Sequence, residues 1–316
     1  MENKTYSLKE KLLGLGELGR PIEWSKSLLN MFLAALISYY IYNSTLNPII
    51  FIAGFLSVAF LWSGLYALND YTDWKIDLIH STKKNRPIPS GKVTPKQGFA
   101  FSIVLILASF LIAFGLNNFL LVLCLGAMLL NQLLYTMDPF RLKSRKIFDI
   151  ISGSMINPFF RYFSGIVLFV SFYRLQTYPI PIFPILFVIG IQFSGYTLYR
   201  LFSKKHDKKI KMKSTVAMLP ENVVKIVAYS VMGVAILSYI GLLINGITFK
   251  IAALGYLPGQ YFFAILIVAA VILVQPSLRS AILNPQKADM KSSYRLLYGM
   301  NIAFVIANLL IFIFMK

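Results

Sequence analysis

Nine stretches of this chain are apolar over lengths that suit a membrane-spanning helix. They lie at residues 25–44, 48–68, 98–116, 118–136, 147–170, 179–201, 223–245, 258–279 and 295–315. The hydrocarbon core of a bilayer is about 30 Å thick, which a helix of roughly 20 residues crosses. Each crossing segment must satisfy its own backbone hydrogen bonds, because no water is present there to do so. The sequence therefore predicts an all-α, polytopic membrane protein with nine transmembrane helices.

The composition agrees with this and excludes several functional classes. Of 316 residues, 57% are hydrophobic and 14% are charged, which is too apolar for an ordinary soluble domain. The formal net charge is +19, and the basic residues lie in short loops between the apolar runs. This pattern indicates membrane lipids and phosphorylated substrates as partners, and no nucleic acid. Cys124 is the only cysteine, which excludes an internal disulfide and a cysteine–histidine zinc site.

The chain is expected to form a single domain over residues 1–316, because no linker is long enough to separate two. Residues 1–24 precede the first apolar run as a cytoplasmic or interfacial segment. Within it, Ser7 and Glu10 have the spacing of a helix capping box. This predicts a short helix over residues 7–19 that lies at the membrane surface.

The strongest functional signal is residues 69–77, which read N-D-Y-T-D-W-K-I-D at the end of the second apolar run. On a helix, positions 69, 70, 73 and 77 lie on roughly one face, so an amide and three carboxylates share a small volume. Such carboxylates repel one another unless a cation is shared among them. Oxygen ligands without His or Cys suit a hard cation, Mg²⁺ before Ca²⁺. Because basic residues follow at positions 80–86, we expect a site for a metal-bound diphosphate.

Residues 69–91, with the ending R-P-I-P-S-G, closely resemble the first signature of the UbiA superfamily of intramembrane prenyltransferases. The resemblance implies helices around a central cavity open to the cytoplasm, where this motif binds Mg²⁺ and the diphosphate of an isoprenoid donor. It implies that the metal ligands are Asn69, Asp70, Asp73 and Asp77. It also implies diphosphate contacts from Asn69, Lys83 and Arg86.

Further stretches add candidates to this set. The loop after the fourth run is similar to the equivalent loop of many UbiA relatives, which implies that Arg141 and Lys143 bind phosphate and act in catalysis with the three aspartates. Arg161 lies within an apolar run, where a charge is costly and usually faces a functional cavity. Residues 210–215, I-K-M-K-S-T, are similar to the segment that follows the second aspartate signature of the family, and they add Lys213 to the diphosphate contacts.

The second aspartate signature itself is degenerate. By spacing, its acids would fall at positions where this chain has Tyr196, Ser203 and Asp207. The family uses that cluster for a second Mg²⁺, so Asp207 is a candidate metal ligand. Lysines at positions 204, 205, 208 and 209 surround it, and their charge favours a phosphate over a divalent cation.

Together these features predict a prenyltransferase of lipid biosynthesis. It would transfer an isoprenoid chain, with Mg²⁺, from a prenyl diphosphate to a cytoplasm-accessible aromatic or lipid-like acceptor within the membrane. One alternative is phosphoribosyl transfer to a polyprenyl phosphate, because residues 80–91 also match the H-x-x-K-x-x-R-P-I-x-S-G of decaprenyl-phosphate phosphoribosyltransferases. Another is a non-catalytic lipid-binding or transport protein derived from this fold, which the missing second acids favour and the intact first motif opposes.

The loop charges predict the topology. Basic residues gather in the loops after the second, fourth, sixth and eighth runs, whereas the alternate loops hold little beyond Arg174 and Lys250. The positive-inside rule then places the N-terminus and the active-site loops in the cytoplasm, and nine spans place the C-terminus outside.

A reporter fused to the C-terminus should be active only outside the cytoplasm. Activity confined to the cytoplasm would show that the number of spans is wrong by one.

Overall fold

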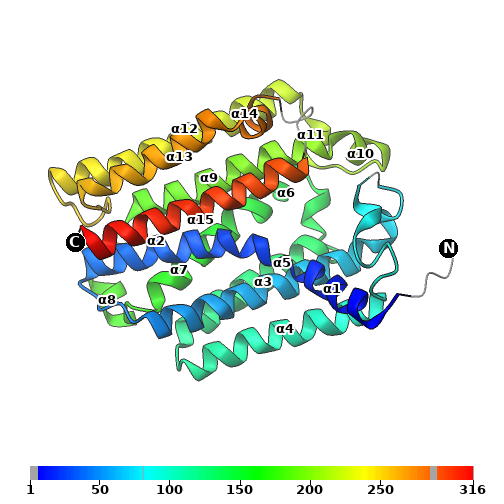
Figure 1. The fold of residues 1–316 in the computed structure, drawn as a ribbon, viewed down its shortest axis with the longest axis horizontal. Helices are drawn as coiled ribbons and strands as arrows, with labels where there is room; N and C mark the ends of the chain where they lie inside the picture. Colours follow the sequence, from blue (N-terminus) through cyan, green and yellow to red (C-terminus); the bar gives the residue numbers. More distant parts are fainter. Residues whose placement is uncertain (1–5, 81, 285–289, 316) are drawn as a thin grey trace.

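The computed structural model describes residues 6–80, 82–284 and 290–315, and within them every regular element is a helix (Figure 1). The expected all-α class is thus confirmed for these residues. Most apolar runs form one helix each, namely α2 (Trp24–Tyr42), α3 (Pro48–Asp77), α4 (Pro95–Gly115), α5 (Phe119–Thr136), α9 (Ile182–Phe202), α12 (Glu221–Ile247) and α15 (Met290–Phe314). The eighth run, predicted as one span over residues 258–279, is divided into η5 (Gly259–Tyr261), α13 (Phe262–Val274) and the start of α14 (Pro276–Leu283). The fifth run is divided into α6 (Phe148–Ile151), the π-helical turn η4 (Ser152–Ile156) and α7 (Asn157–Val167).

Short helices fill the connections between the long ones. They are α1 (Leu8–Gly19), η1 (Pro21–Glu23), η2 (Lys83–Asn85), η3 (Leu142–Ser144), α8 (Phe172–Thr177), α10 (Lys204–Lys209), α11 (Thr215–Met218), η5 (Gly259–Tyr261) and α14 (Pro276–Leu283). The expected domain includes residues 1–5 and 316, and the basic loop after the eighth run includes residues 285–289. These positions lie outside the described residues.

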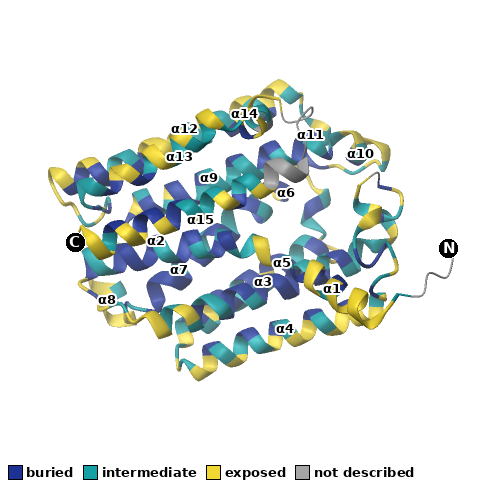
Figure 2. Ribbon diagram, viewed as in Figure 1, coloured by how far each residue is buried: buried dark blue, intermediate teal, exposed yellow. Residues whose placement is uncertain are grey.

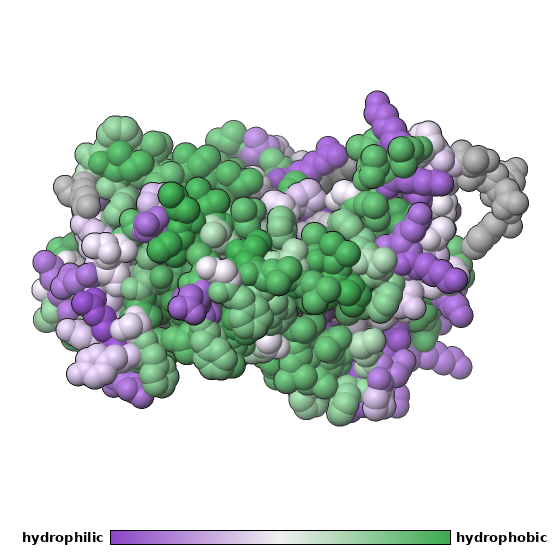
Figure 3. All heavy atoms as spheres, turned by 90° about the horizontal axis from the view of Figure 1, so that it is seen from below, coloured by the Kyte–Doolittle hydropathy of each residue, from purple (hydrophilic) through white to green (hydrophobic). Residues whose placement is uncertain are grey.

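Among the described residues, six helices are long and apolar enough to cross a membrane. They are α3, α4, α5, α9, α12 and residues 295–314 of α15. α13 falls short with 13 residues, and Pro276 begins a separate helix soon after it. On the face shown in Figure 3, hydrophobic residues cover most of the middle and hydrophilic residues gather mainly at the two ends, as expected for a protein whose middle lies in lipid.

The two ends of the bundle differ in what they carry. Figure 1 shows α1, α10 and α11 at one end, which we call the polar end, with the loop that follows α3, whereas α8 and the C-terminus lie at the opposite end. Buried faces of the long helices point toward one another, and the exposed residues lie on the outside and in the loops (Figure 2). One apolar cluster joins α2, α7, α9, α12 and α15, and another joins α3, α4, α5 and α7.

Polar caps set the helix starts. The Asn47 side chain accepts from the backbone N–H groups of Ile49 and Ile50, and Pro48 takes the first position of α3, where its missing N–H costs nothing. The capping box expected at Ser7 and Glu10 is present and starts α1. α1 buries Leu18 against α3, and the exposed leucines Leu8, Leu12 and Leu13 suit a helix at a membrane surface.

Small residues allow the helices to pack closely. A Cβ added at Gly165 of α7 would lie 2.6 Å from the carbonyl oxygen of Met31 and 2.7 Å from Cβ of Ala34, both on α2. Neither of these atoms is the far end of a flexible side chain, so one helix would have to shift. Glycine at this position therefore sets the α2–α7 distance, as small residues often do between membrane helices.

Gly165→Ala should destabilise the protein by about 1–3 kcal/mol, because overpacking forces the backbone apart. Gly126→Ala is the matched control, since nothing lies within 4 Å of a Cβ at that position of α5. Thermal unfolding in detergent would measure both variants, and the control should match the wild type or exceed it slightly. Equal melting temperatures for the two variants would refute this account of α2–α7 packing.

Candidate active site

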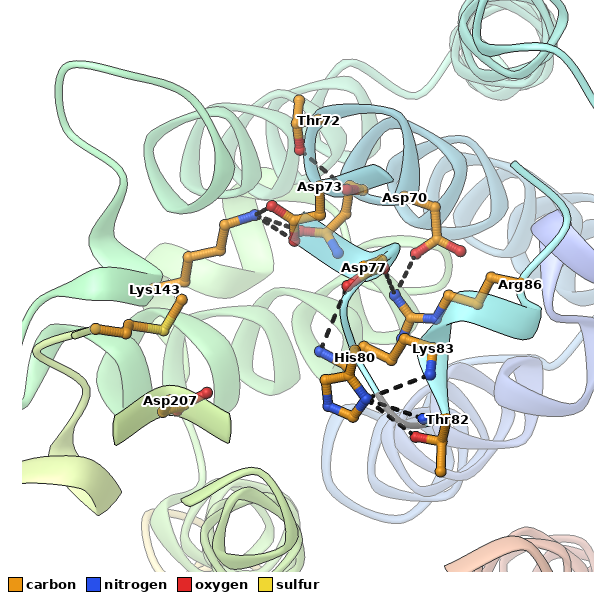
Figure 4. Close-up of polar contacts among 12 residues, drawn as sticks. Asp70, Thr72, Asp73, Asp77, His80, Thr82, Lys83, Arg86, Lys143 and Asp207 are labelled. Carbon is orange, nitrogen blue, oxygen red and sulfur yellow. Dashed lines mark hydrogen bonds and ion pairs between the residues drawn. The ribbon is translucent and has the colours of Figure 1, made fainter. Parts of the chain in front are cut away.

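The last turns of α3 carry Asn69, Asp70, Asp73 and Asp77, because this helix continues without a break to Asp77. Asp70 and Asp77 are 2% exposed, and the Asp73 side chain is 16% exposed. Figure 4 shows the three carboxylates pointing toward basic side chains from the following loop and from η3. The expected clustering of an amide and three acids on one helix is therefore present.

Asp73 and Asn69 are joined to the loop that follows α5. Lys143 Nζ donates to both oxygens of Asp73, at 2.7 and 2.8 Å, and to Asn69 Oδ1 at 3.1 Å. Arg141 Nη2 donates to Asp73 at 3.0 Å. Thr136, at the end of α5, also donates to Asn69 Oδ1, at 2.9 Å. The structure thus places the two predicted cations of this loop on the first motif.

Asp70 and Asp77 share a cation from the next loop. Arg86 Nη1 donates to Asp70 at 3.0 Å and to Asp77 at 2.8 Å, and Lys83 Nζ lies 4.0 Å from Asp77. Arg20, which sequence reasoning did not single out, also donates to Asp70. It follows α1 in a left-handed conformation with φ of 47°. Its only sequence signal is a cation between the surface helix and the first apolar run.

Each carboxylate of the motif is paired with at least one cation. Arg20, Lys83, Arg86, Arg141 and Lys143 face the carboxylates of Asp70, Asp73 and Asp77. Arg20 also lies 3.7 Å from Glu23, and Arg141 lies 3.6 Å from Asp138. The repulsion expected among the acids is thus relieved by side-chain cations. Burial lowers the pKa of Lys143 to about 8, although neighbouring Asp73 opposes this shift. Five cations gathered in one partly buried site suit an anionic ligand.

Two of the predicted diphosphate contacts lie elsewhere. Arg161 is buried in α7, where its guanidinium centre lies 3.8 Å from the centroid of the Trp62 ring and Nη1 donates to Gln192 at 3.2 Å. Cation–π contact and this hydrogen bond offset part of the cost of burying its charge. Lys213 is exposed in the segment between α10 and α11. Their roles as diphosphate contacts remain predictions.

The degenerate second motif forms a separate polar cluster. Asp207 is 2% exposed and accepts from Arg200 Nη2 and from Ser214 Oγ, each at 2.7 Å. Figure 4 shows it on a segment separate from the α3 carboxylates. Sequence reasoning did not single out Arg200, whose only signal is a cation four residues after Tyr196.

Two histidines bring this second segment to the first motif. The rings of His80 and His206 are 4.2 Å apart between centroids. His80 Nδ1 also accepts from the backbone N–H groups of Thr82 and Lys83, so its ring shapes the loop that leads to Arg86. The loop after α3 and helix α10 are therefore in contact at the polar end of the bundle.

A π-helical turn positions a pair of tyrosines beside these clusters. Asn131 of α5 donates to the Ser152 carbonyl at 2.9 Å and to Asn157 Oδ1 at 2.8 Å, and these bonds hold η4 in place. A Cβ at Gly153 in this turn would lie 2.7 Å from the Tyr196 ring. Tyr196 and Tyr135 share a 2.6 Å hydrogen bond between their hydroxyls. Such turns often occur at functional sites.

Among the described residues, no three His, Cys, Asp or Glu side chains converge well enough to hold a metal ion alone. A wide groove of about 1300 Å³ lies next to Arg20. Leucines of α1, together with Tyr199, Arg295 and Tyr298, line it, so its surface is mostly apolar. An acidic and basic site beside an apolar groove suits a ligand with a charged head and an apolar body.

The sequence pattern of the UbiA prenyltransferase family matches residues 29–305, which is most of the chain. The protein belongs to the UbiA prenyltransferase family. Together with its apolar helices, this makes it an integral membrane protein.

Known members of the family resemble the chain over different shares of its length. A 4-hydroxybenzoate octaprenyltransferase from Tolumonas auensis is 25% identical over 66% of each chain. A digeranylgeranylglyceryl phosphate synthase from Methanosarcina mazei is 41% identical over 30% of this chain and 31% of its own. These matches thus span two thirds or less of the relatives. A UbiA homologue from Archaeoglobus fulgidus, solved with DMAPP and Mg²⁺, has the same fold, with a TM-score of 0.67 and 15% identity over 95% of this chain and 99% of its own.

The buried ion pair at Lys143 predicts a coupling that can be measured. Lys143→Met should lower the free energy of unfolding by more than 1 kcal/mol, because it leaves Asp73 with Arg141 alone. Adding Asp73→Asn should restore part of the lost free energy of unfolding. A double-mutant cycle should then give a coupling energy of roughly 0.5–3 kcal/mol between Lys143 and Asp73. Lys92→Met is the control, because its pair with Glu17 is exposed and contributes little. If the effects of Lys143→Met and Asp73→Asn on the free energy of unfolding are additive, the two residues do not stabilise each other.

Proposed function

We propose that this protein transfers an isoprenoid chain from a Mg²⁺-bound prenyl diphosphate to an aromatic or lipid-like acceptor within the membrane. The observation that carries the proposal is that three carboxylates near the end of α3 are paired with five cations from three other segments. This charged site lies where α3 ends, beside α1 and α10 in Figure 1, and the surface of the middle of the bundle is largely apolar (Figure 3). Membership of a prenyltransferase family and a relative solved with DMAPP and Mg²⁺ support it.

The donor set fits Mg²⁺ bound together with the substrate. Asn69, Asp70, Asp73 and Asp77 offer only oxygen ligands, which this ion prefers, and they share the end of one helix. No all-protein metal cage is present among the described residues. Mg²⁺ commonly binds to one or two carboxylates and completes its shell with water and substrate phosphates. When bound, it would offset negative charge on the leaving diphosphate.

The basic residues would act on the diphosphate directly. In the structure Lys83, Arg86, Arg141 and Lys143 neutralise the motif's carboxylates. With substrate present, the carboxylates would turn to the metal and these cations to the diphosphate oxygens. Charge grows on those oxygens as the C–O bond breaks, and fixed cations in a partly buried site stabilise it. Asp70, Asp73, Asp77, Arg141 and Lys143 are thus the proposed catalytic group.

The membrane arrangement completes the proposal. Nine spans would form a single domain around a cavity open to the cytoplasm, with the N-terminus and active-site loops inside and the C-terminus outside. The opposite positions of α1 and the C-terminus in Figure 1 support this arrangement. The apolar groove beside Arg20 is a candidate path for an apolar chain between the bilayer and the site.

A direct assay separates this reaction from the alternatives. Purified protein would be incubated with membrane lipids and either labelled prenyl diphosphate or labelled phosphoribosyl pyrophosphate, and the lipid extract would be analysed. Label transferred only from the prenyl diphosphate is the expected result. Transfer only from the phosphoribosyl donor would favour the alternative enzyme, and binding without transfer from either would favour a non-catalytic protein.

Asp73→Asn should lower turnover at least a hundredfold, equivalent to about 2.7 kcal/mol of transition-state stabilisation. Asp73 joins Arg141 and Lys143 to the motif, so its loss affects the metal ligands and the cations together. Glu17→Gln provides a control on an exposed acid. Steady-state rates with labelled donor would measure both variants. Activity near that of the wild type in Asp73→Asn would remove the first motif from the mechanism.

A further inference from the structure

Arg200 connects three segments at the polar end of the bundle. It lies on the last turn of α9 and is 9% exposed. Its Nη2 atom lies 2.7 Å from Asp207 Oδ2 and 3.9 Å from Asp149 Oδ2. A single guanidinium therefore faces one carboxylate on α10 and another on α6.

Both carboxylates are also held by the segment that follows α10. Ser214 donates to Asp207 at 2.7 Å. Asp149, which is fully buried, accepts from the Thr215 backbone N–H at 3.0 Å and from the Thr215 hydroxyl. The segment 203–215 is thus bonded to one cluster at Asp207 and at its end, Ser214 and Thr215. We call this cluster the Arg200 latch and define it as Asp149, Arg200, Asp207, Ser214 and Thr215.

The latch residues do not fit a metal site. Asp207 is almost fully buried, and the oxygen that faces Arg200 already accepts two hydrogen bonds. Tyr196 and Ser203 supply no carboxylate where further acids would be needed. A divalent ion would have to displace the guanidinium and enter the field of the surrounding lysines, which is electrostatically unfavourable. The prediction that Asp207 binds metal therefore conflicts with its surroundings.

The latched segment carries a strong positive charge. The segment contains six lysines, at positions 204, 205, 208, 209, 211 and 213. The His206 ring contacts His80, so α10 rests against the loop that carries Lys83 and Arg86. Fixing this segment therefore holds α10, with its four lysines, against that loop.

We propose that Arg200 is a positioning residue, whose ion pairs with Asp207 and Asp149 hold the basic segment 203–215 against the diphosphate site in place of a metal ion. The segment thereby adds positive charge around the anionic substrate without touching the reacting atoms. The identity of that substrate rests on the proposed function, whereas the latch and the absence of a metal role for Asp207 do not.

Limited proteolysis tests the latch without any assay of activity. A lysine-specific protease should cut the full-length protein within 203–215 about tenfold faster in Arg200→Gln and in Asp207→Asn. The double variant should be cut no faster than either single variant, because both substitutions open the same contact. Lys225→Gln is the control, since it removes only a helical surface pair with Glu221. Cleavage at the wild-type rate in both single variants would overturn the proposal. If Arg200→Gln does not fold, the cleavage rate of Asp207→Asn is compared with that of the wild type instead.

A metal count tests the second part of the proposal. Mn²⁺ binding would be followed by electron paramagnetic resonance in the presence of inorganic pyrophosphate. Asp207→Asn should bind as many ions per chain as the wild type, whereas loss of one ion in this variant would overturn the proposal. An unchanged count in Asp73→Asn would count against the proposed function and leave the latch intact.

Kinetics separate positioning from catalysis. Arg200→Gln should raise KM for the prenyl diphosphate about tenfold and change kcat less than threefold, because substrate capture is weakened while the reacting groups stay in place. Arg200→Lys keeps a charged donor group, so its KM should lie between the values of the wild type and Arg200→Gln. A large fall in kcat with unchanged KM would contradict a positioning role.

Discussion

The structure depends on the neutralisation of three carboxylates at the end of one long helix. Partly buried charges remain ionised only when opposite charges or polar donors replace the water they lose. Here the compensating cations come from the segment before α2, the loop after α3 and the loop after α5. Segments far apart in sequence are thereby tied to α3, so the same ion pairs that organise the site also fix the polar end of the bundle. The proposed reaction would use these charges by changing their partners rather than by creating new ones.

The sequence was most informative where a pattern is local. The spacing of residues 69, 70, 73 and 77 requires only a helix, and α3 provides it through Asp77. The capping box at Ser7 and the cations at Arg141 and Lys143 could also be found from short motifs, and all three have partners in the structure. Apolar run lengths therefore recovered the fold class, whereas helical spacing and the resemblance of short motifs to the UbiA superfamily recovered much of the acidic and basic site.

Long-range pairings could not be read in the same way. Arg20 lies 50 residues before its partner Asp70, and no local pattern marks it. Arg200 was missed because a cation at a helix end near the membrane surface is common, whereas its two partners depend on how α6 and α10 fold back. The break of the fifth apolar run into a π-helical turn was also hidden, because the bonds from Asn131 that support it cross between helices. Such features depend on tertiary contacts, which composition and spacing do not encode.

The length of α3 has a consequence for where the chemistry takes place. With a rise of about 1.5 Å per residue, the stretch from Pro48 to Asn69 measures roughly 32 Å, close to the thickness of the hydrocarbon core. Because the helix is unbroken, the distance between its first turn and its acidic end is fixed. The phosphate-bearing end of a ligand would then stay at head-group depth while its tail extends toward the bilayer centre. A thicker or thinner bilayer would change the helix tilt and thus the depth of the acidic end, which couples the site to the lipid composition around it.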